Sequence, residues 1–185
     1  MPNKSMPSRV LATASLFVCT LMAGSALASS AEEIDIKVDG ALERFETEVA
    51  GGKEFLQNAK GVLVFPSVVK AGLIIGGEHG KGALRIDGKT AEYYSTTAGS
   101  IGLQAGAQSK TEIIVFMTDE ALAGFRSSKG WEAGVDGNIA VVEWGTGQSL
   151  TTVDAKDPIV GFVFGNKGLM FDLSFEGSKF NKIVP

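Results

Sequence analysis

The chain has 185 residues, of which 17 are basic and 21 acidic, and its formal net charge is −4 at neutral pH. This balance argues against a nucleic-acid partner, which would require a basic surface. Cys19 is the single cysteine, so the fold cannot depend on a disulfide within the chain and must be held by its core.

The first 28 residues have the features of a secretory signal peptide. Lys4 and Arg9 give a positive start, an apolar stretch follows at 10–23, and 26–28 (ALA) matches an A-x-A cleavage site. We therefore expect an exported protein of the periplasm or the cell exterior. Its expected organisation is a signal peptide at 1–28, a tether at 29–33 and a single domain at 34–185.

Cys19 raises the alternative of a lipoprotein, because residues 16–19 (LFVC) loosely resemble a lipobox. The bulky Val18 stands where that signal needs a small residue, and Cys19 lies inside the apolar stretch. The prediction is therefore a chain that begins near Ser29 and carries no lipid on Cys19.

An amphipathic helix is predicted from Ile34 onward. Apolar residues recur there with the spacing of one helical face, at positions 34, 38, 41, 42, 45 and 49. Gly51-Gly52 should end this helix, and 53–60 can add another turn or two.

After Gly61 the pattern changes to short strands separated by turn residues. Strands are expected at 62–65, 73–77, 82–86, 91–96, 101–108, 113–117, 131–135, 139–144, 159–164 and 169–175. Pro66 is expected to stop the first strand, 78–81 and Asp87-Gly88 to form hairpin turns, and Thr118 or Asp119 to cap a helix at 121–127. The predicted fold is α+β and mostly β: a curled antiparallel sheet, barrel- or sandwich-like, with an N-terminal amphipathic helix and one short internal helix.

Glycines are concentrated within these predicted strands, where they need a reason. The usual reasons are a bulge, a sharp bend, or the close approach of another backbone or a ligand. The two groups are Gly72, Gly76, Gly77, Gly80 and Gly82, and then Gly99, Gly102 and Gly106.

No catalytic or metal-binding pattern accompanies the glycines. Residues 76–82 (GGEHGKG) differ in spacing from a phosphate-binding loop and precede no helix, so a hairpin turn is the better interpretation. His79 is the single histidine, and Ser95 and Ser100 lie in no nucleophile elbow. We expect neither an enzyme nor a bound metal or cofactor.

Basic and aromatic residues are scattered over the predicted strand ends and turns. If several of them converge, they can bind lipid phosphates while aromatic rings enter a membrane interface. The alternative is that they are ordinary solvated loop ends and core aromatics. The basic residues are Lys70, Lys81, Arg85, Lys110, Arg126, Lys129 and Lys167, and the aromatic ones are Trp131, Trp144, Phe162 and Phe164.

An ordered set of motifs resembles the SYLF domain family over most of the chain from about residue 42. The motifs lie at 61–66 (GVLVFP), 69–72 (VKAG), 76–82 (GGEHGKG), 94–95 (YS), 102–108 (GLQAGAQ) and 163–171 (VFGNKGLMF). The resemblance implies a non-enzymatic domain that binds membrane lipids, with phosphoinositide-like anionic lipids favoured in eukaryotic members.

We accordingly expect a lipid- or membrane-surface-binding module of the bacterial cell envelope, with Lys70, Lys81, Arg85 and Lys167 as lipid-binding residues. The expected partner is a phospholipid or a membrane surface. The actin-binding role of eukaryotic relatives is not carried over to an exported chain. The alternative function is a structural or self-associating envelope protein without a specific lipid, which would pair through the flat Gly/Gln strand at 101–108.

Overall fold

A computed structural model describes residues 19–72, 75–101, 108–143, 157–165 and 174–185 of the protein. Its helices are α1 (Cys19–Glu48), α2 (Gly52–Gln57) and α3 (Asp119–Ser127). Its strands are β1 (Gly61–Gly72), β2 (Ile75–Ile86), β3 (Lys89–Ile101), β4 (Gln108–Phe116), β5 (Trp131–Glu132), β6 (Ala140–Glu143), β7 (Ile159–Gly165) and β8 (Lys179–Ile183).

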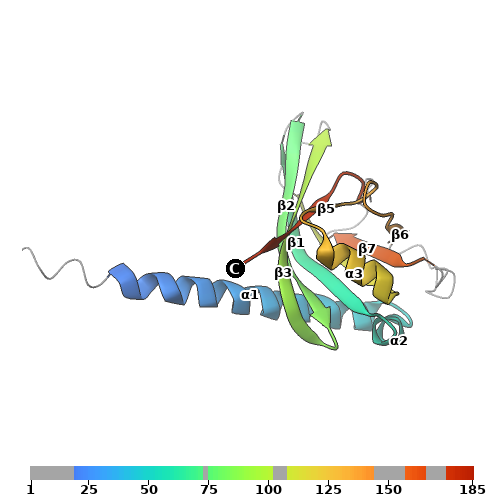
Figure 1. Ribbon diagram of the computed structural model, residues 1–185, viewed down its shortest axis with the longest axis horizontal. Helices are drawn as coiled ribbons and strands as arrows, with labels where there is room; N and C mark the ends of the chain where they lie inside the picture. Colours follow the sequence, from blue (N-terminus) through green and yellow to red (C-terminus); the bar gives the residue numbers. More distant parts are fainter. Residues whose placement is uncertain (1–18, 73–74, 102–107, 144–156, 166–173) are drawn as a thin grey trace, which may run out of the picture.

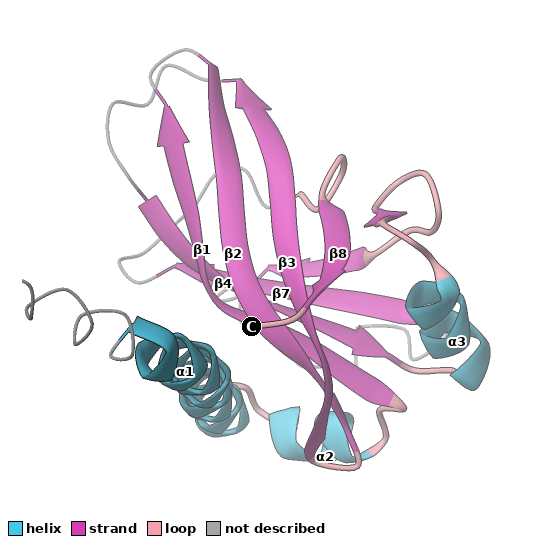
Figure 2. Ribbon diagram, turned by 60° about the vertical axis from the view of Figure 1, so that its left-hand side comes forward, coloured by secondary structure: helices cyan, strands magenta, loops and turns pink. Residues whose placement is uncertain are grey.

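The described strands form one sheet in the order β5-β8-β3-β2-β1-β4-β7-β6. The sheet curls into a half-barrel, with α1 and α2 on one face and α3 on the other (Figure 1, Figure 2). We call the face that carries α1 the outer face and the face that carries α3 the inner face. The expected mostly β fold with a curled sheet is thereby confirmed.

Helix α1 crosses the strands on the outer face, and its N-terminal part extends beyond the sheet (Figure 1). The predicted apolar stripe is confirmed, because Ile34, Val38, Ala41 and Phe45 are all buried. The helix begins at Cys19, well before the predicted start, so residues 29–33 are helical in the full chain. Removal of a signal peptide remains a prediction.

Strand β1 does not stop at Pro66, as the sequence predicted, but continues to Gly72. Its pairing with β2 and with β4 shifts register around Pro66, so β1 holds one extra residue there. Such a bulge accommodates proline because the inserted residue has no ladder hydrogen bond to donate.

The hairpin turn predicted at 78–81 is also wrong, since these residues lie inside β2. Glycine is required in this segment by close packing of two backbones, not by a turn. A Cβ atom on Gly82 would stand 2.0 Å from the carbonyl oxygen of Val64, and one on Gly80 would stand 2.9 Å from that of Ser67. The bulged β1 backbone approaches β2 so closely that only glycine fits.

Two local predictions on turns and caps are confirmed. Asp87 and Gly88 both have positive φ, at 51° and 73°, which is the geometry of a type I′ hairpin turn between β2 and β3. The hydroxyl of Thr118 accepts a hydrogen bond from the backbone N–H of Ala121 and so caps α3.

Two strands differ from the expected antiparallel pattern. β6 pairs with β7 in parallel, and β8 was not predicted although it joins β3 to β5. The strand expected at 131–135 is reduced to Trp131–Glu132. Most of the strands predicted at 101–108 and 169–175 lies outside the described residues.

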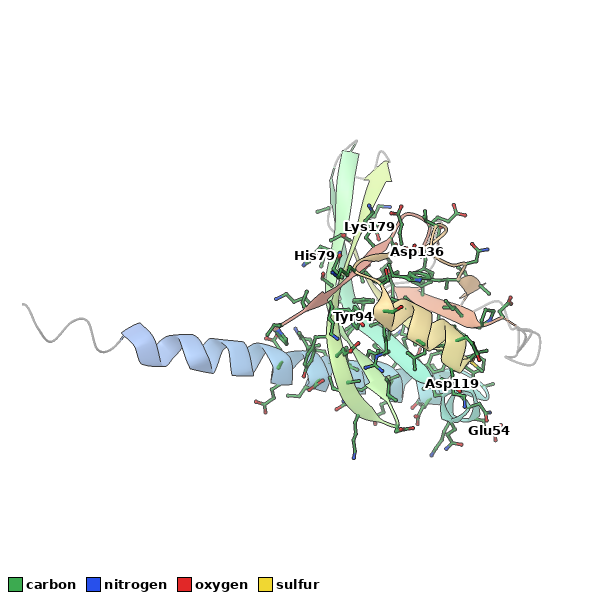
Figure 3. All side chains as sticks on the ribbon, in the orientation of Figure 1. Glu54, His79, Tyr94, Asp119, Asp136 and Lys179 are labelled. Atoms are coloured by element: carbon green, nitrogen blue, oxygen red, sulfur yellow. The ribbon has the colours of Figure 1, made fainter. Side chains whose placement is uncertain are left out.

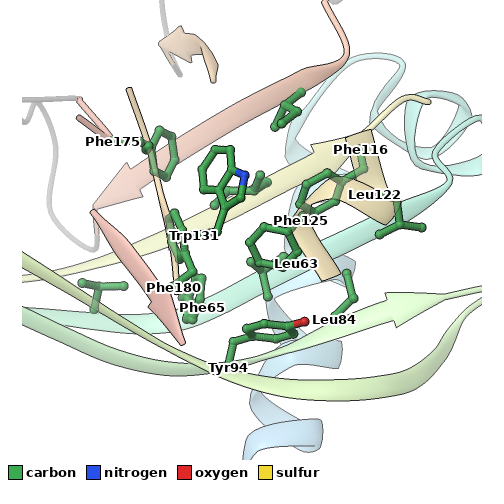
Figure 4. Close-up of a cluster of buried hydrophobic side chains, with 14 of the residues drawn as sticks. Leu63, Phe65, Leu84, Tyr94, Phe116, Leu122, Phe125, Trp131, Phe175 and Phe180 are labelled. Carbon is green, nitrogen blue, oxygen red and sulfur yellow. The ribbon is translucent and has the colours of Figure 1, made fainter. Parts of the chain in front are cut away.

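The alternation of side chains along the strands builds one core on each face. The outer core lies under α1 and includes Val62, Val64, Ala83, Ile113 and Phe162. The inner core is strongly aromatic and lies between the sheet and α3 (Figure 4). Its members include Leu63, Phe65, Leu84, Tyr94, Phe116, Leu122, Phe125, Trp131, Phe175 and Phe180.

The carboxylate of Glu92 joins three elements at the border of the inner core. It accepts hydrogen bonds from Tyr94 Oη at 2.6 Å, from Arg126 Nη2 of α3 at 3.0 Å, and from Lys182 Nζ of β8. Burial alone would raise the pKa of Glu92, but the hydrogen bonds from Arg126, Lys182 and Tyr94 outweigh it and lower the pKa to about 2.

The Glu92 carboxylate should make the free energy of unfolding depend on pH in the acid range. Because the folded pKa lies below the usual 4.5, Glu92 stabilises the fold above about pH 4.5 and loses that contribution as the pH falls toward 2. We expect Glu92 to account for about 1–2 kcal/mol of the stability lost between pH 6 and pH 3, after allowance for the exposure of Arg126 and Lys182. Urea unfolding at both pH values should show a smaller loss for Glu92→Gln than for the wild type. Equal losses would contradict this assignment.

Candidate functional site

The outer face of the sheet is only partly covered. Helix α1 packs over the part of the sheet that contains Ala83 and Arg85, whereas residues farther along the same side of β2 are exposed. We call the uncovered part the open outer face. It consists of Ser67, Val69, His79, Lys81, Ser95, Thr97, Lys179 and Asn181.

Two rows of directly paired residues make up this face. The first row runs from Ser67 of β1 through Lys81 and Ser95 to Asn181 of β8. The second row runs from Val69 through His79 and Thr97 to Lys179. Figure 3 labels His79 and Lys179 on this upper part of the sheet. The surface is therefore rich in hydroxyl groups, and it carries two lysines and the histidine.

The charge of the open outer face has one sign. Lys81 is exposed, and no hydrogen bond or ion pair joins its side chain to another described residue. Lys179 pairs with Glu132 of the neighbouring edge strand at 3.1 Å, and its side chain remains 58% exposed. The face itself includes no carboxylate among the described residues, so an anion can approach Lys81 without repulsion.

Arg85, a predicted lipid-binding residue, lies on the same side of β2 but under α1. Its guanidinium is 2.7 Å from Asp39 Oδ1 and 3.4 Å from Asp35 Oδ1, and only 11% of its side chain is exposed. Asp35 also accepts hydrogen bonds from the hydroxyls of Thr90 and Tyr93. Burial, with the hydrogen bond to Asp35, raises the pKa of Tyr93. Arg85 therefore clamps the helix to the sheet.

Lys70, a second predicted residue, faces the opposite side of the sheet. Its Nζ lies 3.5 Å from Glu78 Oε1, and Lys110 Nζ lies 2.7 Å from Glu78 Oε2 and 3.0 Å from Glu112 Oε1. We call these four residues the inner charge cluster. Lys110 and Glu112 are almost completely buried, and Glu112 Oε2 has no hydrogen-bond partner among the described residues.

Burial and ion pairing shift the pKa values of two members of the inner charge cluster. Burial raises the pKa of the Glu112 carboxyl, and the ammonium of Lys110 offsets this only in part. Burial alone would lower the pKa of Lys110, but Glu112 and Glu78 hold it above its usual value. Lys110 thus stays charged beside Glu78, as an ion pair that is almost completely buried.

The structure does not gather the predicted residues into one site. Lys81 stands on the open outer face, Arg85 is covered by α1, and Lys70 points to the inner face, while Lys167 lies outside the described residues. His79, Thr97 and Lys179 were missed as members of a surface. Strand alternation would have grouped His79 with Lys81 if 78–81 had been recognised as strand, whereas Lys179 depends on the unpredicted β8.

A scan against known protein families supplies independent evidence. Residues 97–182 match the family Ysc84, described as "Las17-binding protein actin regulator", which is the SYLF family. Residues 97–182 belong to the SYLF family. The suspected SYLF resemblance is confirmed, and it indicates a lipid- or actin-related binding module. No curated protein matches the chain.

The SYLF match spans β4 to β7 and α3, and includes parts of β3 and β8. On the open outer face it contains Thr97, Lys179 and Asn181, whereas Lys81 and His79 precede it. Within the described residues, no group of three or more His, Cys, Asp or Glu side chains is placed to hold a metal ion. No described helix is long and apolar enough to cross a membrane.

Proposed function

We propose that this SYLF protein is a non-enzymatic module of the bacterial cell envelope that binds anionic membrane surfaces through its open outer face. The observation that carries the proposal is Lys81, an exposed lysine that no described carboxylate neutralises, on a surface of hydroxyl, amide and histidine side chains. The proposal includes export to the periplasm or the cell exterior, as the N-terminal sequence predicts.

The chemistry of this face suits phosphate groups at a membrane surface. Ammonium groups such as those of Lys81 and Lys179 attract anionic headgroups, at about 1 kcal/mol for each lysine near the surface. The exposed hydroxyls of Ser67 and Thr97 can donate hydrogen bonds to phosphate oxygens. Val69, which is 43% exposed, adds a small apolar contact.

The family description alone does not select the ligand. Its printed name concerns actin regulation, and we do not carry an actin partner to a chain that we propose to be exported. The acidic surface of α1 also disfavours membrane binding through that helix. The open outer face is therefore the surface on which the proposal depends.

Vesicle co-sedimentation tests the proposal. We expect the protein to sediment with vesicles that contain phosphatidylglycerol and to remain in the supernatant with phosphatidylcholine alone. Lys81→Gln should weaken the binding about fivefold, and Lys81→Gln with Lys179→Gln about twentyfold or more, because each lysine contributes about 1 kcal/mol. Added salt should weaken binding further.

Lys53→Gln is the matched control, because Lys53 is an exposed lysine of α2, which packs through Phe55 on Phe162 of β7 and not on the strands of the open outer face. It should bind vesicles as the wild type does. Absence of binding to anionic vesicles at low salt would overturn the proposal. Equal losses for Lys53→Gln and Lys81→Gln would show that only net charge matters and would overturn the assignment to this face.

A further inference from the structure

His79 stands in the middle of the open outer face, where it is labelled in Figure 3. It is exposed, and it lies between Val69 of β1 and Thr97 of β3 in the second row. It is the single histidine of the chain. The proposed membrane binding depends on Lys81 and Lys179, and it leaves the imidazole without a role.

Both lysines of the face are neighbours of His79. Lys81 follows it by two residues on β2, so the two side chains leave the same side of the strand about 7 Å apart. Lys179 lies in the same row as His79 but two strands away, about 10 Å across β3. Thr97 stands directly between His79 and Lys179, and Ser95 is the β3 partner of Lys81. A protonated His79 therefore completes a triangle of positive charges around two hydroxyl groups.

Among the described residues, no carboxylate is a direct neighbour of His79 on its own side of the sheet. The neighbours there are Gly77 and Lys81 of β2, Ser67, Val69 and Ala71 of β1, and Ser95, Thr97 and Gly99 of β3. Glu78 precedes His79 in the chain, but it points to the inner face and is paired there with Lys70 and Lys110. A proton taken up by His79 is therefore not neutralised by an adjacent acid.

The carboxylates of β5 and α1 that contact the sheet lie farther from the histidine and are paired. Glu132 of β5 is three strand spacings away, about 14 Å, and pairs with Lys179. Asp35 and Asp39 of α1 are bound to Arg85, which lies six residues along β2 from the histidine, or about 20 Å. Two further glutamates are paired within α1, Glu33 with Lys37 and Glu48 with Arg44. The positive charge gained on protonation is thus available to an approaching anion.

We propose that His79 is a proton-dependent anion-binding residue of the open outer face, and that its protonation strengthens the binding of anionic lipid as the pH falls from about 7.5 to about 5.5. This inference rests on the proposed membrane function and adds regulation of the same surface. Histidine is the side chain that ordinarily changes charge in this pH range. The imidazolium adds a third positive charge beside Lys81 and Lys179, and both of its N–H groups can donate to phosphate oxygens. Protons and anionic headgroups therefore each favour the binding of the other.

Vesicle co-sedimentation of the full chain at two pH values tests this inference. With phosphatidylglycerol vesicles, the wild type should bind about fivefold more tightly at about pH 5.5 than at about pH 7.5, the gain expected from one added charge near the surface. Phosphatidylglycerol is a phosphodiester, so the vesicle keeps its charge over this range. His79→Gln should lose most of the gain because it cannot take up the proton. His79→Lys should also lose it, since its charge is present at both pH values.

A variant that moves the histidine supplies the matched control. His79→Gln combined with Gln57→His keeps the composition of the chain and places the imidazole at an exposed position of α2, away from the open outer face. It should behave like His79→Gln, with circular dichroism at both pH values to check that each variant is folded. A restored gain would show that only net charge matters and would overturn the assignment to His79. A full gain in His79→Gln alone would place the proton on another group, such as the buried Glu112, and would also overturn it.

Failure of this inference is distinguishable from failure of the proposed function. Wild-type binding of equal strength at both pH values would remove the role of His79 and leave membrane binding intact. Absence of binding to anionic vesicles at both pH values and low salt would overturn the membrane function, and the role of His79 with it.

Discussion

Replacing Phe125 with alanine is expected to lower the free energy of unfolding by about 3–5 kcal/mol. Phe125 of α3 is 2% exposed, and its ring lies 4.9 Å from that of Phe116 and 5.0 Å from that of Tyr94, measured between centroids. It also contacts Trp131 and Phe180 edge-on (Figure 4). Truncation would remove α3's main contact with the sheet and leave a cavity between rings from β3, β4, β5 and β8.

Urea unfolding of the variant and of the wild type measures this loss. Val184→Ala is the control, because Val184 is 94% exposed and should change stability by less than about 0.5 kcal/mol. If Phe125→Ala changed stability as little as this control does, α3 would not be packed on the inner core as described.

Replacing Lys110 with methionine should also cost about 3–5 kcal/mol, because it breaks a buried ion pair from one side. Methionine fills a similar volume, so the loss is electrostatic rather than a packing defect. Glu112, 1% exposed, would keep its carboxyl in the interior without the ammonium at 3.0 Å, and Glu78 would lose its hydrogen bond at 2.7 Å. The deficit of the variant relative to the wild type should shrink as the pH falls, since protonation neutralises Glu112, whose pKa burial already raises.

A second substitution distinguishes the uncompensated charge of Glu112 from a general disruption of packing. Lys110→Met combined with Glu112→Leu should recover much of the loss, because replacing both partners removes the uncompensated charge. Lys53→Met, at an exposed lysine of α2, should be nearly neutral. If the double variant were less stable than Lys110→Met alone, an uncompensated charge on Glu112 would not be the source of the loss.

The sequence predicted those parts of the fold in which local chemistry decides the structure. The apolar stripe of α1, the Asp87-Gly88 turn and the Thr118 cap each depend on residues within one or two turns of chain. The prediction of a hairpin turn at 78–81 was wrong because Gly80 and Gly82 are required by the close approach of the β1 backbone, about 15 residues away in the chain, and not by a local turn. β8 was missed for a related reason, since its short polar sequence is a strand only when β3 and β5 flank it.

The candidate site was predictable only in part. Lys81 could be singled out as a basic residue, but its exposure depends on where α1 lies across the sheet. Arg85 and Lys70 look equivalent to Lys81 in the sequence. Their different roles follow from Asp35 and Asp39 in α1 and from Glu78 in β2, which tertiary folding brings next to them.

The position of β8 has a consequence for how the protein folds. Pairs such as Tyr93 with Ile183 join residues far apart in the chain, and Phe180 completes the aromatic core from this strand. Such contacts raise the contact order, and the entropy of closing long loops slows folding. Until β8 docks, β3 has an unpaired edge that can pair with other chains. Docking of β8 within the chain should therefore compete with aggregation. Low protein concentration, or a chaperone bound to the exposed edge of β3, should favour docking.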